Sequence, residues 1–550
     1  MSPRPAATAL AEPGATAAPA STQSRALAHS PTGVSAAPTA FAAPAPPAVQ
    51  PTARAQHRIL ITITVMLASI MQALDTTIAN VALPRIQGSL SATQDQMTWV
   101  LTSYIVATAI MTPLSGWLAG QIGRRRVFLF SLVGFTLASA FCGLAQTLPQ
   151  IVIARLLQGL CGAALVPMSQ AILLDINPPK DHPRAMAIWV MAVTIGPILG
   201  PAFGGWLTEN YNWRWVFYIN VPLGILSVLG TISFIAETPV RKSRFDFFGF
   251  ATLSLAIGAV QLLLDRGQLK DWFSSPEIWA LASVAALSCY LFVVHMFTTS
   301  AAPFVSPGLF KDRNFLTGCV FIFIVGLVLF ATLALLPPLL QNLMNYPVVL
   351  TGLVTAPRGI GTLAAMLIVS RLIGRIDTRL IIVIGLAITA LSLWQMTGFY
   401  LQMDTSMVIW TGLAQGLGSG MVYVPLATVA FATLAPAYRN EGTAFFSLIR
   451  NIGSSIGISV VTSMLTRNTQ MMHSRLAEHV TPYLDPLHAA TPVTTRSIAM
   501  LNHTVTTQAT MIAYNNDFKM MMILSLCSIP FVALLRGAKS KADTATLVVE

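Results

Sequence analysis

The chain has 550 residues, of which 54% are hydrophobic and only 9% are charged, and its mean hydropathy is +0.68. Soluble domains carry about one charged residue in four, so this composition excludes a soluble globular protein. A transmembrane helix needs about 20 apolar residues, and the length therefore allows many spans. The net charge of +12 is typical of nucleic-acid binding. We nevertheless expect no nucleic-acid partner, because the basic residues collect in loops on one side of the predicted membrane.

Residues 1–57 form an Ala/Pro-rich stretch with few aromatic residues, which we interpret as a disordered cytoplasmic tail. No apolar core follows a basic start, so we do not interpret it as a signal peptide. From Arg58 onward we predict fourteen apolar segments, centred near residues 70, 107, 136, 161, 195, 226, 256, 287, 327, 361, 390, 421, 453 and 527.

The distribution of Lys and Arg between the predicted loops sets the orientation. With the N-terminal tail inside, the inside loops and termini hold nineteen basic residues and the outside loops hold eight. Basic residues favour the cytoplasmic side of short loops. The pattern therefore predicts a multi-pass protein of the cytoplasmic (inner) membrane, with lipid around it and both termini in the cytoplasm.

An internal repeat relates the two ends of the chain. QGLCGAALVP at 158–167 reappears as QGLGSGMVYVP at 415–425, and IGPILG at 195–200 matches IGSSIG at 452–457, both at an offset of 257 residues. GQIGRR at 120–125 aligns with GRIDTR at 374–379. Three ordered matches at nearly one offset indicate two parallel halves of six spans each, and the seventh and eighth spans form an inserted pair.

Several motifs occur in a fixed order along the spans: LDTTIANVALP (74–84), GWLAGQIGRRR (116–126), ARLLQGLCGAA (154–164), GPILGPAFGG (196–205), NWRWVFYINVPLG (212–224), FDFFG (245–249) and LIRNIGSSIGI (448–458). From about Ile59 to Arg536 the chain resembles the fourteen-span drug:proton antiporters of the EmrB/QacA type, in the major facilitator superfamily. The resemblance implies an all-α polytopic membrane protein with two pseudo-symmetric six-helix halves plus two inserted helices, fourteen transmembrane helices in all.

This resemblance and the repeat give the expected domain organisation. We predict an N-terminal half at 58–240, the inserted helix pair at 241–300, a C-terminal half at 301–538 and a cytoplasmic tail at 539–550. The C-terminal half contains a periplasmic or extracellular loop at 467–516, and residues 499–518 within it are predicted to extend the last helix outward.

Asp75 lies about sixteen residues into the first span, where a charge costs roughly 2.5–3.5 kcal/mol on insertion scales. Arg155 in the fourth span belongs to the same half and is the expected partner. A carboxylate balanced between burial and a nearby arginine can bind and release a proton. We therefore predict that Asp75 is the proton-coupling acid and that Arg155 tunes it, which the resemblance also implies. A structural ion pair between two helices is the alternative.

Further polar residues fall on spans expected to line a central cavity. Arg358 and Arg450 either attract an anionic substrate or bind backbone carbonyls exposed by nearby Pro and Gly residues, and both interpretations stay open. The uncharged groups are either substrate contacts or helix–helix hydrogen bonds. The predicted cavity residues are Gln72, Asn80, Gln158, Arg358, Gln415 and Arg450.

The stretch GPILGPAFGG contributes the small and helix-breaking residues Gly196, Pro197, Gly200, Pro201, Gly204 and Gly205. Small residues four apart let two helices approach closely, and neighbouring helices can satisfy groups freed by proline. A kinked packing helix is one interpretation. The resemblance implies instead an antiporter hinge whose glycine face packs against the other half and seals the cavity.

The loop after the second span carries Gly116, Gly123, Arg124, Arg125 and Arg126. These arginines either anchor to lipid phosphates, clasp a cytoplasmic loop during rocking, or serve only as an orientation signal. Gly120 stands where the resembled family commonly carries an acid, so we do not expect a charge-relay gate here.

We therefore predict a proton-coupled antiporter that exports amphipathic drugs or other small toxic molecules by alternating access. The alternative is a proton-coupled symporter, or a narrow-substrate metabolite or fatty-acid exporter, on the same fold. No enzyme activity, catalytic residue or cofactor is expected, since the proton gradient drives transport, and the cysteine spacing indicates no metal site. The resemblance adds a periplasmic adaptor and an outer-membrane channel as partners if the cell is Gram-negative.

Overall fold

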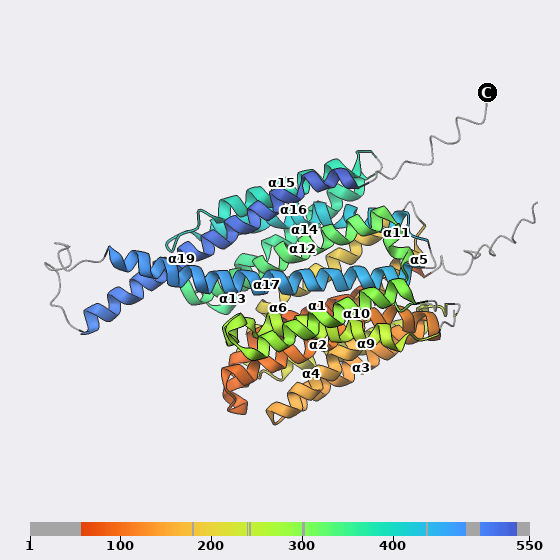
Figure 1. The fold of residues 1–550 in the computed structure, drawn as a ribbon, viewed down its shortest axis with the longest axis horizontal. Helices are drawn as coiled ribbons and strands as arrows, with labels where there is room; N and C mark the ends of the chain where they lie inside the picture. The colour runs from red at the N-terminus through yellow and green to blue at the C-terminus, as the bar shows by residue number, and fades with distance from the viewer. Residues whose placement is uncertain are drawn as a thin grey trace, which may run out of the picture. The chain divides into compact units, whose positions relative to one another are not determined.

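A computed structural model describes residues 57–178, 181–238, 240, 244–299, 303–373, 375–435, 438–479 and 495–535. The predicted tails, apart from residue 57 at the N-terminal side, lie outside the described residues. The described chain is a bundle of long helices running roughly side by side (Figure 1). Each of the fourteen predicted centres falls within a helix.

The N-terminal half packs α1 on α6 and α8, α2 on α4, and α3 on α4 and α8. The fourth span is divided into two helices, and the sixth starts with a short helical turn. The elements are α1 (Arg58–Leu90), α2 (Gln94–Ile122), α3 (Arg124–Leu144), α4 (Leu148–Gly162), α5 (Leu165–Ile176), α6 (His182–Asn210), α7 (Trp215–Tyr218) and α8 (Asn220–Phe234).

The C-terminal half packs α14 on α16, α12 on α17, and α15 on α16 and α19. Pro337 and Pro338 end α12, and a π-helical turn follows them. The elements are α11 (Gly308–Lys311), α12 (Arg313–Pro338), η4 (Leu339–Leu343), α13 (Val348–Thr355), α14 (Pro357–Leu372), α15 (Thr378–Met396), α16 (Thr405–Ala432), α17 (Arg439–Glu478), α19 (Thr495–Ser528) and η6 (Pro530–Leu534).

The inserted pair consists of α9 (Phe247–Gly267) and α10 (Pro276–Thr298), with the turns η2 (Gln268–Lys270) and η3 (Trp272–Ser274) between them. α9 contacts both halves, because it packs on α2 and on α17. The Ser459 hydroxyl of α17 donates to the Leu264 carbonyl at 2.9 Å, and Asp265 accepts from Thr102 of α2. The inserted pair therefore lies against the junction of the halves.

Acidic residues begin several of these helices. Asp312, Asp377 and Asp404 accept hydrogen bonds from the first backbone amides of α12, α15 and α16, which lack partners inside the helix. Asp246 does the same for α9. These side chains stabilise the helix ends and explain why the apolar segments start where they do.

Among the described residues, thirteen helical segments are long and apolar enough to cross a membrane. α6, which holds the fifth predicted span, has a shorter apolar stretch at Arg184–Gly196. The predicted extension of the last helix over 499–518 is confirmed, since α19 starts at Thr495. The predicted outside loop 467–516 is helical at both ends: α17 continues to Glu478 and α19 starts at Thr495, and in Figure 1 α17 and α19 run past the neighbouring helices at one end.

Candidate functional site

Asp75 of α1 and Arg155 of α4 form an ion pair inside the N-terminal half. The Arg155 Nη1 atom lies 2.7 Å from Asp75 Oδ2, and the two side chains are 1% and 0% exposed. A charge buried this deeply is tolerated when it is paired and hydrogen-bonded. The prediction that Asp75 and Arg155 are partners is therefore confirmed by the contact between their side chains.

Two amides complete the carboxylate's surroundings. Gln158 Nε2 and Asn220 Nδ2 donate to Asp75 Oδ1 at 2.9 Å and 2.8 Å, and both residues are fully buried. Arg155 Nη1 also donates to Gln158 Oε1 at 2.8 Å. Both oxygens of the carboxylate are thus hydrogen-bonded, and helices α1, α4 and α8 meet at this one group.

Aromatic rings enclose the guanidinium. The Arg155 Cζ atom lies 4.5 Å from the Tyr104 ring centroid and 5.6 Å from that of Phe217, distances at which a cation is attracted to the ring face. Its Nε donates to the Val100 carbonyl at 3.3 Å. Tyr104 and Val100 belong to α2, so the second span also contacts the network.

Sequence reasoning missed Asn220 as a site residue, although it lies in the quoted stretch NWRWVFYINVPLG. Its Nδ2 also contacts Ser139 Oγ at 3.0 Å, and that hydroxyl donates to the Phe217 carbonyl. An uncharged amide gives no signal in the sequence that separates it from an ordinary helix–helix hydrogen bond. Gln158, predicted as a cavity residue, lies instead inside the ion-pair network.

The remaining predicted cavity residues lie in different surroundings. Gln72 is buried one turn before Asp75, whereas Asn80 is exposed and lies outside the ion-pair network. In the C-terminal half, Gln415 Nε2 donates to Thr332 Oγ1 at 3.0 Å. Arg358 and Arg450 are buried in the same half, at 5% and 8% exposure.

A second buried acid, Asp517 of α19, was also missed, because sequence reasoning placed it in the outward extension of the last helix over 499–518. Its side chain is 0% exposed, and neither carboxyl oxygen has a hydrogen-bond partner within the described part of the chain. An acid within the apolar pattern of the last helix was the available signal.

Gly196 and Gly200 of GPILGPAFGG face α1 of their own half, and not the other half as the resemblance implied. A Cβ atom added at Gly196 would lie 2.5 Å from the backbone of Ala73 and Leu74, and one at Gly200 would meet Thr77, all on α1 of the same half. The Thr77 hydroxyl also contacts the Gly196 carbonyl at 3.3 Å. The expectation is corrected: these small residues allow α1 and α6 to pack closely.

α6 contacts the other half as well, through α13, α14 and α16. Gly204 and Gly205 are buried in α6, and Pro197 and Pro201 lie within the same helix. α6 is thus held between α1 on its own side and three helices of the C-terminal half. Close packing on α1 fixes the position of α6 at the junction.

The motif after α2 forms contacts between segments far apart in sequence. Gly116 faces the backbone of Asn440 and Glu441 in α17, so a Cβ atom there would lie 3.1 Å from them. Gly123 has a φ of +90°, a conformation that favours glycine. Arg125 donates to the Ile232 carbonyl at 2.7 Å.

Asp175 of α5 binds two arginines and connects the halves. It forms ion pairs with Arg124 and with Arg439 of α17, the latter at 3.2 Å. Arg124 also donates to Asn440. The expectation that Gly120 leaves this motif without a charge-relay gate stays a prediction, but α5 supplies an acid that Arg124 and Arg439 share. Of the three interpretations of the basic motif, the clasp agrees with these contacts.

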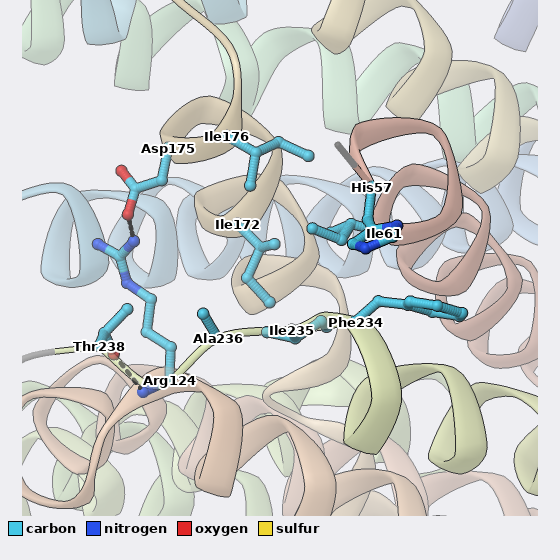
Figure 2. A pocket seen from close by; sticks show the side chains of 10 residues that line it. All are labelled: His57, Ile61, Arg124, Ile172, Asp175, Ile176, Phe234, Ile235, Ala236 and Thr238. Carbon is cyan, nitrogen blue, oxygen red and sulfur yellow. Dashed lines mark hydrogen bonds and ion pairs between the residues drawn. The ribbon is translucent and has the colours of Figure 1, made fainter. Parts of the chain in front are cut away.

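A small cavity lies beside this clasp (Figure 2). It occupies about 90 Å³ between α1, α5 and the segment after α8, and its walls are mainly apolar, with Arg124 and Asp175 at one side and His57 at another. The cavity is lined by the N-terminal half alone and includes no member of the Asp75 network. It is therefore separate from the buried ion pair.

Within the described residues, no group of three or more His, Cys, Asp or Glu side chains is placed to hold a metal ion. The described cysteines are free. The buried polar groups of the site are the Asp75–Arg155 ion pair, the amides of Gln158 and Asn220 around it, and Arg358 and Arg450 of the other half.

Comparisons with known proteins agree with this architecture. The family model described as Major Facilitator Superfamily matches residues 65–458. The chain is 36% identical over 483 residues to the fatty acid resistance protein FarB of Neisseria gonorrhoeae, covering 86% of this chain and 95% of that protein. It is 38% identical over 429 residues to the multidrug export protein EmrB of Escherichia coli (strain K12), covering 77% and 83%.

Among solved structures, the human organic anion transporter MFSD10 (TETRAN) has a TM-score of 0.56 at 14% sequence identity, covering 85% of this chain and 99% of that one. At this identity the similarity shows the fold alone. The predicted fold class, an all-α polytopic membrane protein of paired helical halves, is confirmed.

Proposed function

The chain belongs to the Major Facilitator Superfamily, and we propose that it is a proton-coupled antiporter that exports amphipathic drugs or other small toxic molecules by alternating access. Relatives named multidrug export protein and fatty acid resistance protein support this proposal over most of the chain. The function requires a multi-pass membrane protein, and thirteen apolar helical segments among the described residues provide the spans.

One observation carries the proton-coupling part of the proposal: the fully buried Asp75 carboxylate, with three donors on its two oxygens. Arg155 and the two amides stabilise its ionised form, whereas burial opposes it. When the surroundings of Asp75 open to water on the outside, a proton can neutralise the carboxylate and release Arg155 from it. Reopening to the inside then lets the proton leave and the ion pair form again.

Coupling follows if the two states of the pair favour different orientations of the halves. Each proton that moves inward supplies about 2.3 kcal/mol per 100 mV of membrane potential, and the pH gradient adds to this. The substrate moves outward in the same cycle. Because α1, α2, α4 and α8 all contact the pair, a change in its charge acts on four helices of one half.

The experiment compares wild type with Asp75→Asn in proteoliposomes, under an imposed proton gradient and with a panel of lipophilic probes. We expect gradient-driven movement in wild type and its loss in Asp75→Asn. Asp404→Asn is the matched control, since Asp404 is exposed at the start of α16. Unchanged transport in Asp75→Asn would make the pair structural, and no gradient-driven movement of any probe by wild type would contradict the antiporter.

The panel also tests the narrower candidate, an exporter of fatty acids or metabolites, which the similarity to FarB favours. Movement confined to fatty acids would support that candidate, and movement of chemically unrelated probes would support a multidrug exporter. Inward movement together with protons would indicate a symporter.

We further propose that the protein lies in the cytoplasmic membrane with both termini in the cytoplasm, as the distribution of basic residues predicts. The projecting ends of α17 and α19 then lie outside, where a periplasmic adaptor can dock in a Gram-negative cell. Labelling of single cysteines from either side of intact cells tests this. Co-purification of an adaptor that is lost when 479–494 is shortened tests the partner.

A further inference from the structure

Two buried arginines of the C-terminal half have no carboxylate partner among the described residues. Arg358 of α14 and Arg450 of α17 form no ion pair with any acid in the described part of the chain. This contrasts with Arg155, which is paired at 2.7 Å. An intramembrane charge costs roughly 2.5–3.5 kcal/mol on insertion scales and generally marks a functional group or has a partner.

The contacts that the two guanidiniums do make leave donors free. Arg358 Nη2 donates to the Leu329 carbonyl at 3.3 Å, but its Nη1 is buried without a partner among the described residues. Arg450 donates to Tyr423 Oη at 3.2 Å and to Asn451 Oδ1 at 3.3 Å, and its Nε is similarly unpartnered. Backbone carbonyls alone therefore do not account for these residues.

Both arginines lie along one face of α12. Arg358 reaches Leu329, and the backbone and Cγ of Arg450 pack against Gly326, where an added Cβ atom would lie 2.5 Å from the Arg450 carbonyl oxygen. Residues three apart on a helix are neighbours on its surface. Both arginines thus contact adjacent turns of α12, Arg358 through its guanidinium and Arg450 through its backbone and Cγ.

The N-terminal half contributes one aromatic side chain, Trp189, to this region. Trp189 of α6 is fully buried, and its ring centroid lies 6.1 Å from that of Tyr423, the residue that accepts from Arg450. The Trp189 Nε1 atom is a third buried donor without a partner in the described structure. The arginines therefore lie near the junction of the halves, where an alternating-access transporter exposes its substrate site.

We propose that Arg358 and Arg450 bind the anionic headgroup of an amphipathic acid, such as a carboxylate with an apolar tail. This inference rests on the proposed export function and specifies a substrate class for it. Two guanidiniums with free N–H groups match the oxygens of a carboxylate and gain charge-assisted hydrogen bonds from it. The apolar tail packs against aromatic and aliphatic side chains such as Trp189, which avoids exposing it to water.

The assignment also fits the charge balance of the two halves. The Asp75–Arg155 pair is neutral as long as Asp75 is ionised, so it offers little net attraction to an anion. The region around α12 carries instead two positive charges that have no acidic partner in the part of the chain that the structure describes. An acidic substrate bound there neutralises part of this charge, and the proton and substrate sites then lie in different halves.

The test measures equilibrium binding of laurate to the full-length protein in phosphatidylcholine nanodiscs, near neutral pH and without a gradient. Methyl laurate has the same tail without the charge, and tetraphenylphosphonium is a cationic probe. In wild type we expect laurate to bind at least about tenfold more tightly than methyl laurate. Equal affinities would overturn the proposal without any variant being needed.

Variants then locate the site. Arg358→Gln and Arg450→Gln should each weaken laurate binding by about tenfold and change methyl laurate or tetraphenylphosphonium binding by less than about threefold. The Lys variants should recover part of the affinity, because they keep the charge but lose the fork of donors. Arg371→Gln is the matched control, since Arg371 is exposed on the same helix as Arg358.

Unchanged laurate affinity in both Gln variants, or an equal loss for all three probes, would contradict the site. Loss in only one variant would contradict the two-arginine arrangement. Because binding is measured without a gradient, its outcome is independent of the transport experiment. Charge-selective binding without gradient-driven transport would refute the antiporter and leave the site, and transport without charge-selective binding would refute the site alone.

Discussion

The side-chain amide of Asn220 donates to Asp75 Oδ1 at 2.8 Å, although Asn220 and Asp75 are 145 positions apart in the sequence. Arg155 binds the other carboxyl oxygen, Oδ2. The same amide group contacts Ser139, so α8 connects the buried acid to α3. Arg155 alone would leave one carboxyl oxygen dependent on Gln158. Asn220 therefore belongs to the proposed proton site as a residue that positions and stabilises the carboxylate.

We predict that Asn220→Ala weakens proton-driven transport without preventing folding. A hydrogen bond to a charged group contributes about 1.5–3 kcal/mol, and its loss leaves the Asp75 carboxylate less firmly held in the network. The rate of proton-driven transport in proteoliposomes should therefore fall. Thermal unfolding in detergent checks that the variant is folded.

Asn210→Ala is the control for that experiment. Asn210 is exposed at the end of α6 and donates only to the Trp206 carbonyl of its own helix, at 2.9 Å. It should leave the transport rate unchanged. An identical transport rate in Asn220→Ala and wild type would show that Asn220 does not contribute to the proton site.

Substituting the glycines of α6 should separate two kinds of close contact. Gly196→Ala places a methyl group against the backbone of Ala73 and Leu74, which cannot rotate away. Overpacking of this kind costs about 1–3 kcal/mol. Gly200→Ala meets the Thr77 side chain instead, so adding Thr77→Ala should restore most of its loss of stability.

Gly88→Ala provides the comparison, because nothing lies within 4 Å of a Cβ atom at that position of α1. Alanine is the better helix former, so this change should be neutral or stabilising. Melting temperatures of the four variants in detergent test the series. If Gly196→Ala melts like Gly88→Ala, the contact between α1 and α6 is not tight.

The glycine motif also illustrates what could be predicted from the sequence. The four-residue spacing of Gly196 and Gly200 correctly predicts a face that packs closely against another helix. Which helix it packs against depends on how α6 is rotated in the bundle, and helical spacing carries no information about that rotation. The error concerned the partner, α1 instead of the other half.

The ion pair was predictable for a different reason. Charged residues are rare inside membrane spans. Because Asp75 and Arg155 lie in spans of the same half, the sequence alone was enough to predict that they form a pair. Asp175 was not predicted as part of the clasp, because it lies near a predicted loop, where a charge is unremarkable. Its function depends on the distance to Arg124 and Arg439, which are 51 and 264 positions away and come together only in the fold.

We predict that Asp175→Asn loosens the contact between the halves at the end of the bundle that holds the clasp. The change leaves Arg124 and Arg439 without their shared acid. The loss in the free energy of unfolding should lie between the roughly 1 kcal/mol that an exposed ion pair contributes and the roughly 3–5 kcal/mol that breaking a buried pair costs. Amide hydrogen exchange should become faster at the start of α17 and around Gly116.

Glu237→Gln is the matched control, since Glu237 pairs at 3.2 Å with the largely exposed Arg126 and does not connect the halves. It should leave exchange at α17 unchanged. Equal exchange rates at α17 in Asp175→Asn and wild type would mean that the clasp does not hold the halves together.

Asp246 should give the protein an acid-sensitive connection at the inserted pair. Its carboxylate accepts from the amides of Gly249 and Phe304 at 2.9 Å and 3.0 Å, and from His295 at 2.9 Å. Burial acts to raise the pKa of Asp246, but these hydrogen bonds outweigh it, and the pKa is lowered below its ordinary value. The carboxylate therefore connects the start of α9 to α10 and to the segment before α11.

A carboxyl group whose pKa is lowered by folding stabilises the fold fully at pH values above its pKa in the unfolded chain, about 3.9. This contribution disappears as the pH falls through the pKa of the group in the folded protein. We predict that Asp246→Asn lowers the melting temperature near neutral pH and that the difference from wild type shrinks below about pH 4. Asp377→Asn, at the exposed start of α15, should show little change at either pH, because asparagine is an equally good helix cap. A difference between wild type and Asp246→Asn that persists undiminished in acid would assign the effect to lost packing instead of the ionised carboxylate.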